Sequence, residues 1–140
     1  MGQVINSYQL SESGENSLLK PLIYCNPDAE LMEMSISIEE RMTENLLKYE
    51  PKYRRRHVAG CFDAILADLP RDRTLRDIDI LFNPSYSIDV LKMMISACKR
   101  KNFNVIWPGR YEVGCLIYAE EGCKDYIKYR VADYDITCIL

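Results

Sequence analysis

The sequence has little of what metal and redox sites require. It contains one histidine, His57, so a histidine-rich metal cluster is excluded. Its six cysteines are scattered singly with no Cys-x-x-Cys pair, and this spacing predicts neither a zinc site nor a redox motif. A Cys–His nucleophile pair would have to use His57. Because His57 follows three arginines at the start of a helical pattern, we interpret it as a solvated neighbour of the core.

Long apolar runs and targeting signals are missing too. No window approaches the ~18 consecutive apolar residues of a membrane span, and residues 1–16 have no basic start followed by an apolar run. We therefore expect a cytoplasmic protein without membrane contacts. The 140 residues suit one domain, and 28% charged with 48% apolar residues is an ordinary globular composition. Residues 1–17 are polar and predict a loosely tied segment ahead of a single domain over residues 18–140.

Hydrophobic periodicity predicts an α/β domain, in which strands alternate with covering helices. Six short apolar or alternating runs are the candidates for a set of about five strands, and they lie at residues 21–25, 34–38, 78–82, 103–107, 112–119 and 134–140. Helices are expected over residues 39–49 and 53–69, and a third is expected to begin at Ser87 as its N-cap. The closing strands are joined by short links, so the sheet is predicted to be mixed, with an antiparallel edge.

Two segments carry a resemblance to a known family. Residues 80–94 read ILFNPSYSIDVLKMM, and residues 105–126 read VIWPGRYEVGCLIYAEEGCKDY. This wording resembles the C-terminal half of the small P-loop-type component of bacteriophage-exclusion (BREX) defence systems, and the resemblance extends back to about Met34. It implies a single reduced P-loop-NTPase-like three-layer domain with three or more helices. It also implies that larger protein subunits of the same defence system are the partners.

The motif that gives the P-loop its name is absent. A P-loop is a Gly-rich loop ending in Lys-Ser/Thr, whose amides cradle phosphates. Only Gly2 and Gly14 precede Gly60, and neither begins such a motif. Where the loop should follow the first strand, residues 26–30 read Asn-Pro-Asp-Ala-Glu, in which two acids repel a polyphosphate and Pro27 lacks an amide hydrogen. We expect phosphate recognition there to be lost.

The second nucleotide element, an acid that orients Mg²⁺ at the end of an apolar strand, is also in doubt. Matched to the family, this acid falls near Arg76 or Asp77, inside the charged tract of residues 71–77. Asp77 and Asp79 are the candidate nucleotide or metal residues. The competing interpretation makes them strand-edge carboxylates paired with Arg73 or Arg76.

Two further groups are candidate contact residues. Arg54, Arg55 and Arg56 form a basic run that suits phosphates or an acidic partner, although the net charge of −3 argues against avid nonspecific DNA binding. The aromatic turn of Trp107, Pro108 and Tyr111 carries no catalytic group. It is therefore interpreted as a surface for docking onto a partner, with a core position for Trp107 as the alternative.

Three functions remain open. The preferred one is a non-catalytic accessory subunit of an anti-phage defence system, acting through protein contacts and needing no cofactor. The second is an ATPase-like subunit that binds ATP and Mg²⁺ at a diverged phosphate site, and it must replace both the loop lysine and the metal-orienting acid. The third is a nucleic-acid contact module, and it rests on the arginines alone.

Overall fold

The computed structural model describes residues 2–6 and 20–140 of the chain. Within this part, nine strands form two sheets, and four α-helices and three short 3₁₀ helices connect them. The strands of the larger sheet are β1 (Gln3–Ile5), β2 (Leu22–Tyr24), β3 (Ile36–Ser37), β4 (Arg73–Arg76), β5 (Phe103–Ile106) and β9 (Thr137–Ile139). The smaller sheet contains β6 (Arg110–Glu112), β7 (Cys115–Tyr118) and β8 (Ile127–Arg130).

The larger sheet has the order β1-β9-β2-β5-β4-β3, and all its pairs are parallel. Its central strands β2 and β5 are short apolar runs buried along most of their length, which is typical of parallel sheets covered on both faces. The fold is therefore α/β, as predicted. The predicted mixed sheet of about five strands is wrong, because the antiparallel strands leave the parallel sheet and pair in a sheet of their own.

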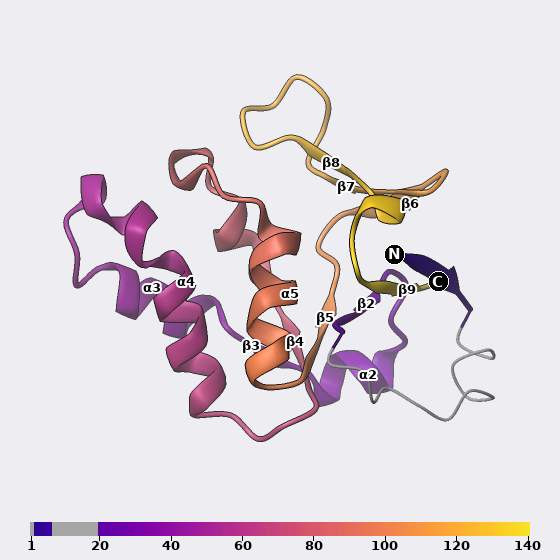
Figure 1. The fold of residues 1–140 in the computed structure, drawn as a ribbon, viewed down its shortest axis with the longest axis horizontal. Coiled ribbons are helices and arrows are strands. Elements are labelled where there is room, and N and C mark those ends of the chain that lie inside the picture. Colours follow the sequence, from indigo (N-terminus) through magenta and orange to yellow (C-terminus); the bar gives the residue numbers. More distant parts are fainter. Residues whose placement is uncertain (1, 7–19) are drawn as a thin grey trace.

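Helices lie on the connections that follow β2, β3 and β4, whereas the small antiparallel sheet lies between β5 and β9. The helices are α2 (Ala29–Met34), α3 (Glu39–Leu46), α4 (Pro51–Ala67) and α5 (Val90–Arg100). Figure 1 shows α3, α4 and α5 together at one side of the sheet and α2 apart from them. Pro51 opens α4, where its missing N–H costs nothing, and α3 ends before it.

The main core lies between the parallel sheet and the helices α3, α4 and α5. The apolar face of α4 presents Phe62, whose ring meets Phe103 of β5 edge to face at 5.4 Å between centroids. Met94 of α5 and Leu75 of β4 are also fully buried in this core. Burial of each such side chain contributes about 1.5–3 kcal/mol. The three-and-four spacing of apolar residues in α4 is thus explained by packing alone.

Residues 78–82 do not form the predicted strand. They form the 3₁₀ helix η1 (Ile78–Phe82), and the strand precedes them as β4, inside the charged tract. In β4 only Leu75 is fully buried, so the strand lacks the apolar signal that sequence reasoning requires. Asp77 ends the strand with a left-handed backbone, φ 59°, which prevents the extended conformation from continuing into the apolar run.

The start of α5 also differs from prediction. Asp89 is the N-cap, and its Oδ1 accepts the amide of Lys92 at 3.0 Å. Ser87, the predicted cap, instead ends the 3₁₀ helix η2 (Pro84–Tyr86) with φ 48°. The second carboxylate oxygen of Asp89 accepts a hydrogen bond from Tyr134 at 2.7 Å. One side chain therefore fixes the start of α5 and the segment that leads into β9.

The expected loosely tied N-terminal segment includes a strand. Gln3–Ile5 pair with β9 as β1, the edge strand of the parallel sheet, so ordered structure begins before Leu18. The rest of that segment, residues 7–17, lies outside the described residues. No described helix has the length and apolar character needed to cross a membrane.

Candidate functional site

The carboxyl edge of the parallel sheet is the place where α/β proteins bind ligands. Because all six strands run in the same direction, the residues that follow them meet along this edge. Asp77 follows β4, Trp107 follows β5, and the connection of residues 25–28 joins β2 to α2. Two of the sequence candidates, Asp77 and Trp107, are therefore brought to the same edge.

The connection between β2 and α2 occupies the position of a phosphate loop, between a buried strand and a helix. Asp28 is the N-cap of α2, and its Oδ1 accepts the amide of Leu31 at 2.8 Å. A carboxylate of the chain itself therefore satisfies an amide at this helix start. α2 has six residues, none of them buried, so the helix is both short and superficial. The loss of phosphate recognition expected for this segment stays a prediction.

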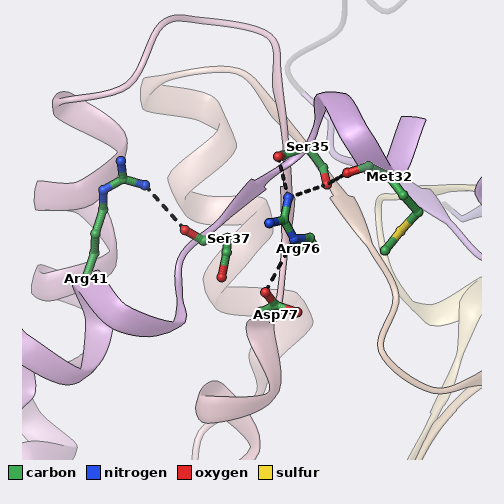
Figure 2. A network of polar contacts seen from close by, with 6 residues as sticks. All are labelled: Met32, Ser35, Ser37, Arg41, Arg76 and Asp77. Carbon is green, nitrogen blue, oxygen red and sulfur yellow. Dashed lines mark hydrogen bonds and ion pairs between the residues drawn. The ribbon is translucent and has the colours of Figure 1, made fainter. Parts of the chain in front are cut away.

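Asp77 belongs to a polar network that ties β4 to the end of α2 (Figure 2). The guanidinium of Arg76 pairs through Nε with Asp77 Oδ2 at 3.5 Å, and its Nη1 donates to the carbonyl and hydroxyl oxygens of Ser35. The hydroxyl of Ser35 in turn donates to the carbonyl of Met32 at 2.6 Å. Arg76 thus links β4 to Ser35 at the end of α2, which lies 41 residues earlier in the chain. The carboxylate of Asp77 balances the positive charge of the Arg76 guanidinium, as the ion-pair interpretation predicts.

Asp79 has a different partner. It lies on η1, and its Oδ2 accepts a hydrogen bond from the phenol of Tyr118 at 3.1 Å rather than pairing with an arginine. Burial, and then the negative charge of Asp79, raise the pKa of Tyr118 to about 12. The ring of Tyr118 stacks on Phe82 with 4.1 Å between centroids, so η1 is fastened to β7. The exposed side of Asp79 borders an open depression lined by Glu39, Ile80, Phe82, Asn83, Pro84 and Asp125.

Trp107 is a core residue. It is 3% exposed, and its Nε1 donates to the carbonyl of Ile117 in β7 at 3.0 Å. Its ring meets Phe82 edge to face at 5.4 Å between centroids. The docking role expected for Trp107 is therefore corrected, since its ring is covered by the chain itself. Pro108 and Tyr111 stay partly exposed.

The Trp-Pro-Gly wording has a packing explanation. A Cβ on Gly109 would lie 1.8 Å from the carbonyl oxygen of Ile117, the same oxygen that Trp107 binds. Only glycine permits this close approach. The turn that Gly109 makes possible joins the parallel sheet to the small antiparallel sheet. Arg110, the first residue of β6, donates to the carbonyl of Ala119 at 3.1 Å and pairs with Glu120 at 3.6 Å, both in the segment that follows β7. The Trp-Pro-Gly turn therefore connects the two sheets, and residues 119–126 connect β7 to β8 within the smaller sheet.

The three sequence-predicted arginines lie on α4 and have different roles. Arg54 is used by the chain, because its Nε donates to the carbonyls of Leu46 and Tyr49, each at 3.1 Å. Arg55 and Arg56 are exposed. His57, interpreted as a solvated neighbour, is half-buried and stacks on Tyr49 with 3.7 Å between ring centroids.

Cysteines and acids form no metal centre in the described part of the chain, where no group of three or more His, Cys, Asp or Glu side chains is arranged to hold an ion. All six cysteines are free. Cys25, at the carboxyl end of β2, has its pKa lowered by a hydrogen bond with Cys138 of β9, whose own pKa is raised by the same contact. Sequence spacing gave no signal for this pair, because 113 positions separate two cysteines that neighbouring strands bring together.

No family model, curated protein or solved structure matches this chain. The resemblance to the defence family therefore stays a prediction from the wording of the two segments.

Proposed function

We propose that this chain is a non-catalytic accessory subunit that acts through protein contacts. The observation that carries this proposal is the Asp28 cap at the start of α2. It places a carboxylate on the amide, and negative charge at the helix start, where a nucleotide-binding relative would need free amides and positive charge for phosphates. A chain built in this way loses the main electrostatic attraction for a nucleotide at that edge of the sheet.

The candidate metal acids support the same proposal, because both already have partners. Asp77 pairs with Arg76, and Asp79 accepts the hydrogen bond of Tyr118. Recruitment of either carboxylate to Mg²⁺ would have to compete with these contacts. The resemblance of residues 80–94 and 105–126 supplies the setting that we propose, which is a cytoplasmic defence system of the BREX type with larger protein subunits as partners.

The contact surface that we assign is the hairpin of β6 and β7. Its two-residue loop, Val113-Gly114, has positive φ at both positions, 44° and 78°, as a type I′ turn requires. Valine is poorly suited to this conformation, because its branched Cβ is crowded there. Val113 is also 97% exposed, so its side chain packs on nothing in the chain. A strained, fully exposed apolar residue favours a contact outside the chain.

The strand next to this loop supports a protein partner. β6 is an edge strand of the small sheet, so one side of its backbone has no strand neighbour among the described residues. Tyr111 of β6 is partly exposed, and its hydroxyl accepts the amide of Gly114 at 3.1 Å, which stiffens the hairpin. A rigid hairpin with an open edge suits docking by strand pairing with an apolar tip.

Co-expression with the products of neighbouring genes tests the proposal. We expect one of these larger proteins to bind the parent chain, and Val113→Asn to weaken that binding at least tenfold. Because asparagine suits the type I′ turn, the free energy of unfolding of the same variant should be about 1 kcal/mol higher than that of the parent. Binding is measured by calorimetry and stability by urea unfolding.

The matched control is Ser87→Asn. Ser87 also has a positive φ and an exposed side chain, but it lies at the end of η2 and outside the hairpin. This variant should keep the parent's affinity. If Val113→Asn binds as tightly as the parent, or if no neighbouring product binds at all, the proposed docking role is wrong.

The ATPase-like alternative has one observation in its favour. Asp77 stands at the carboxyl end of a strand, which is where a metal-orienting acid belongs. A titration with ATP and Mg²⁺ separates the two functions.

A further inference from the structure

The junction of α3 and α4 exposes basic and aromatic side chains on one surface. It lies at the left end of the view in Figure 1, at the opposite end of the molecule from β1 and β9. Tyr49 and Tyr53 are 36% and 41% exposed there. We name the α4 basic surface after the residues that form it: Lys48, Tyr49, Lys52, Tyr53, Arg55 and Arg56.

Tyr53 stands among cations. The ammonium of Lys52 lies 5.0 Å from the centre of its ring, and the guanidinium carbon of Arg56 lies 5.5 Å from it. A second aromatic group lies one turn along α4, where His57 stacks on Tyr49 with an interplanar angle of 6°. Cationic and aromatic side chains therefore alternate along the first two turns of α4, in the order Lys52, Tyr53, Arg56 and His57. Aromatic rings interleaved with cations are the means by which proteins hold unpaired nucleotides.

The cations of this surface are mostly free to bind a ligand. Within the described part of the chain, Arg55 and Arg56 form no ion pair, and Lys52 approaches only Glu50, at 3.9 Å with both side chains well exposed. An exposed pair of this kind is weak, so it competes little with a phosphate. Arg54 differs, since it is fixed to the carbonyls that end α3.

Beyond the arginines, the surface of α4 carries no side chain at Gly60. Gly60 lies one turn after Arg56, and a Cβ at Gly60 would meet nothing within 4 Å. A glycine inside a helix costs about 1 kcal/mol relative to alanine, and the packing of this chain gives no reason for it. A strand of nucleotides following Arg56 along α4 would therefore meet no side chain at that point.

We propose that the α4 basic surface binds single-stranded nucleic acid, with Lys52, Arg55 and Arg56 at the phosphates and Tyr53 stacked on a base. Paired duplex bases present no free face to Tyr53, and a peptide of Asp and Glu offers negative charge but no aromatic ring to stack on it. This surface lies on α4 and not on the hairpin of β6 and β7, so the inference is independent of the proposed partner contact.

Fluorescence anisotropy with a labelled thymidine dodecamer tests the proposal. We expect saturable binding whose association constant falls with salt, with a slope of about −2 in a plot of log K against log salt, since three cations contact phosphates and single strands give roughly −0.7 per contact. Arg55→Ala with Arg56→Ala should weaken binding at least tenfold and flatten the slope by about 1.4. Arg71→Ala with Arg73→Ala removes the same charge from exposed positions elsewhere and should change affinity less than threefold.

The stacking step has its own readout. Tyr53→Leu should weaken binding about tenfold at unchanged salt slope, whereas Tyr53→Phe keeps the ring and should bind like the parent. Circular dichroism of every variant confirms that α4 is intact. The proposal is overturned by absence of saturable binding, by equal losses in the two arginine double variants, or by equal binding of a duplex or of polyglutamate.

Discussion

Replacement of Trp107 by alanine should destabilise the fold severely. The variant removes a ring that is 3% exposed and packs edge to face on Phe82 and Tyr129, at 5.4 and 6.3 Å between centroids. Truncation of a buried aromatic side chain costs about 3–5 kcal/mol. It also removes the donor from the Ile117 carbonyl, and an unsatisfied buried acceptor costs about 1–3 kcal/mol. These terms overlap, so we expect a total of about 4–6 kcal/mol, much of the stability of a typical domain.

Trp107→Phe separates the two contributions. It keeps most of the ring but cannot donate to Ile117, so its cost should be close to that of the lost donor, about 1–3 kcal/mol. Urea unfolding followed by far-ultraviolet circular dichroism measures both variants. Tyr53→Ala, which removes an aromatic ring that is 41% exposed, is the control and should cost under about 1 kcal/mol. If the free energy of unfolding of Trp107→Ala lies within about 1 kcal/mol of the parent's, Trp107 does not hold the two sheets together and its assignment to the core is wrong.

Two further predictions concern stability. Asp89→Ala removes both the cap of α5 and the acceptor of the Tyr134 hydroxyl, so urea unfolding should show a loss of about 2–3 kcal/mol, against about 1–2 kcal/mol for Tyr134→Phe, which keeps the cap. Tyr118 has a folded-state pKa of about 12, raised from its ordinary value of 10.0. The stability due to its neutral phenol is therefore complete below pH 10 and is lost as the pH rises through 12. Between pH 10 and 12, the free energy of unfolding should depend less on pH in Tyr118→Phe than in the parent. An unchanged pH dependence would contradict the assigned pKa.

Sequence reasoning succeeded where apolar spacing carries the structure. The runs at β2 and β5 are short and nearly continuous, and the apolar stripe of α4 repeats every three or four residues, so their type is predictable. It failed at β4 because a strand flanked by arginines shows only one buried position, Leu75. The apolar run of η1, which follows β4 directly, was therefore predicted as the strand.

The candidate site was only partly predictable, for a related reason. Asp77 could be placed near a strand end, and its pairing with Arg76 proposed, from the sequence alone, but the link of Arg76 to Ser35 depends on a contact across 41 residues. Trp107 was ambiguous because a strand-end aromatic looks the same in sequence whether it is covered or exposed. Its cover comes from β7 and β8, and β8 (Ile127–Arg130) was not predicted at all.

Titration of the chain with ATP and Mg²⁺ by isothermal calorimetry tests the central claim most directly. Because Asp28 caps the helix where phosphates would bind and Asp77 pairs with Arg76, we predict no saturable heat in the micromolar range. Saturable micromolar binding that Asp77→Ala weakens would contradict the account and establish a diverged nucleotide site at the carboxyl edge of the sheet.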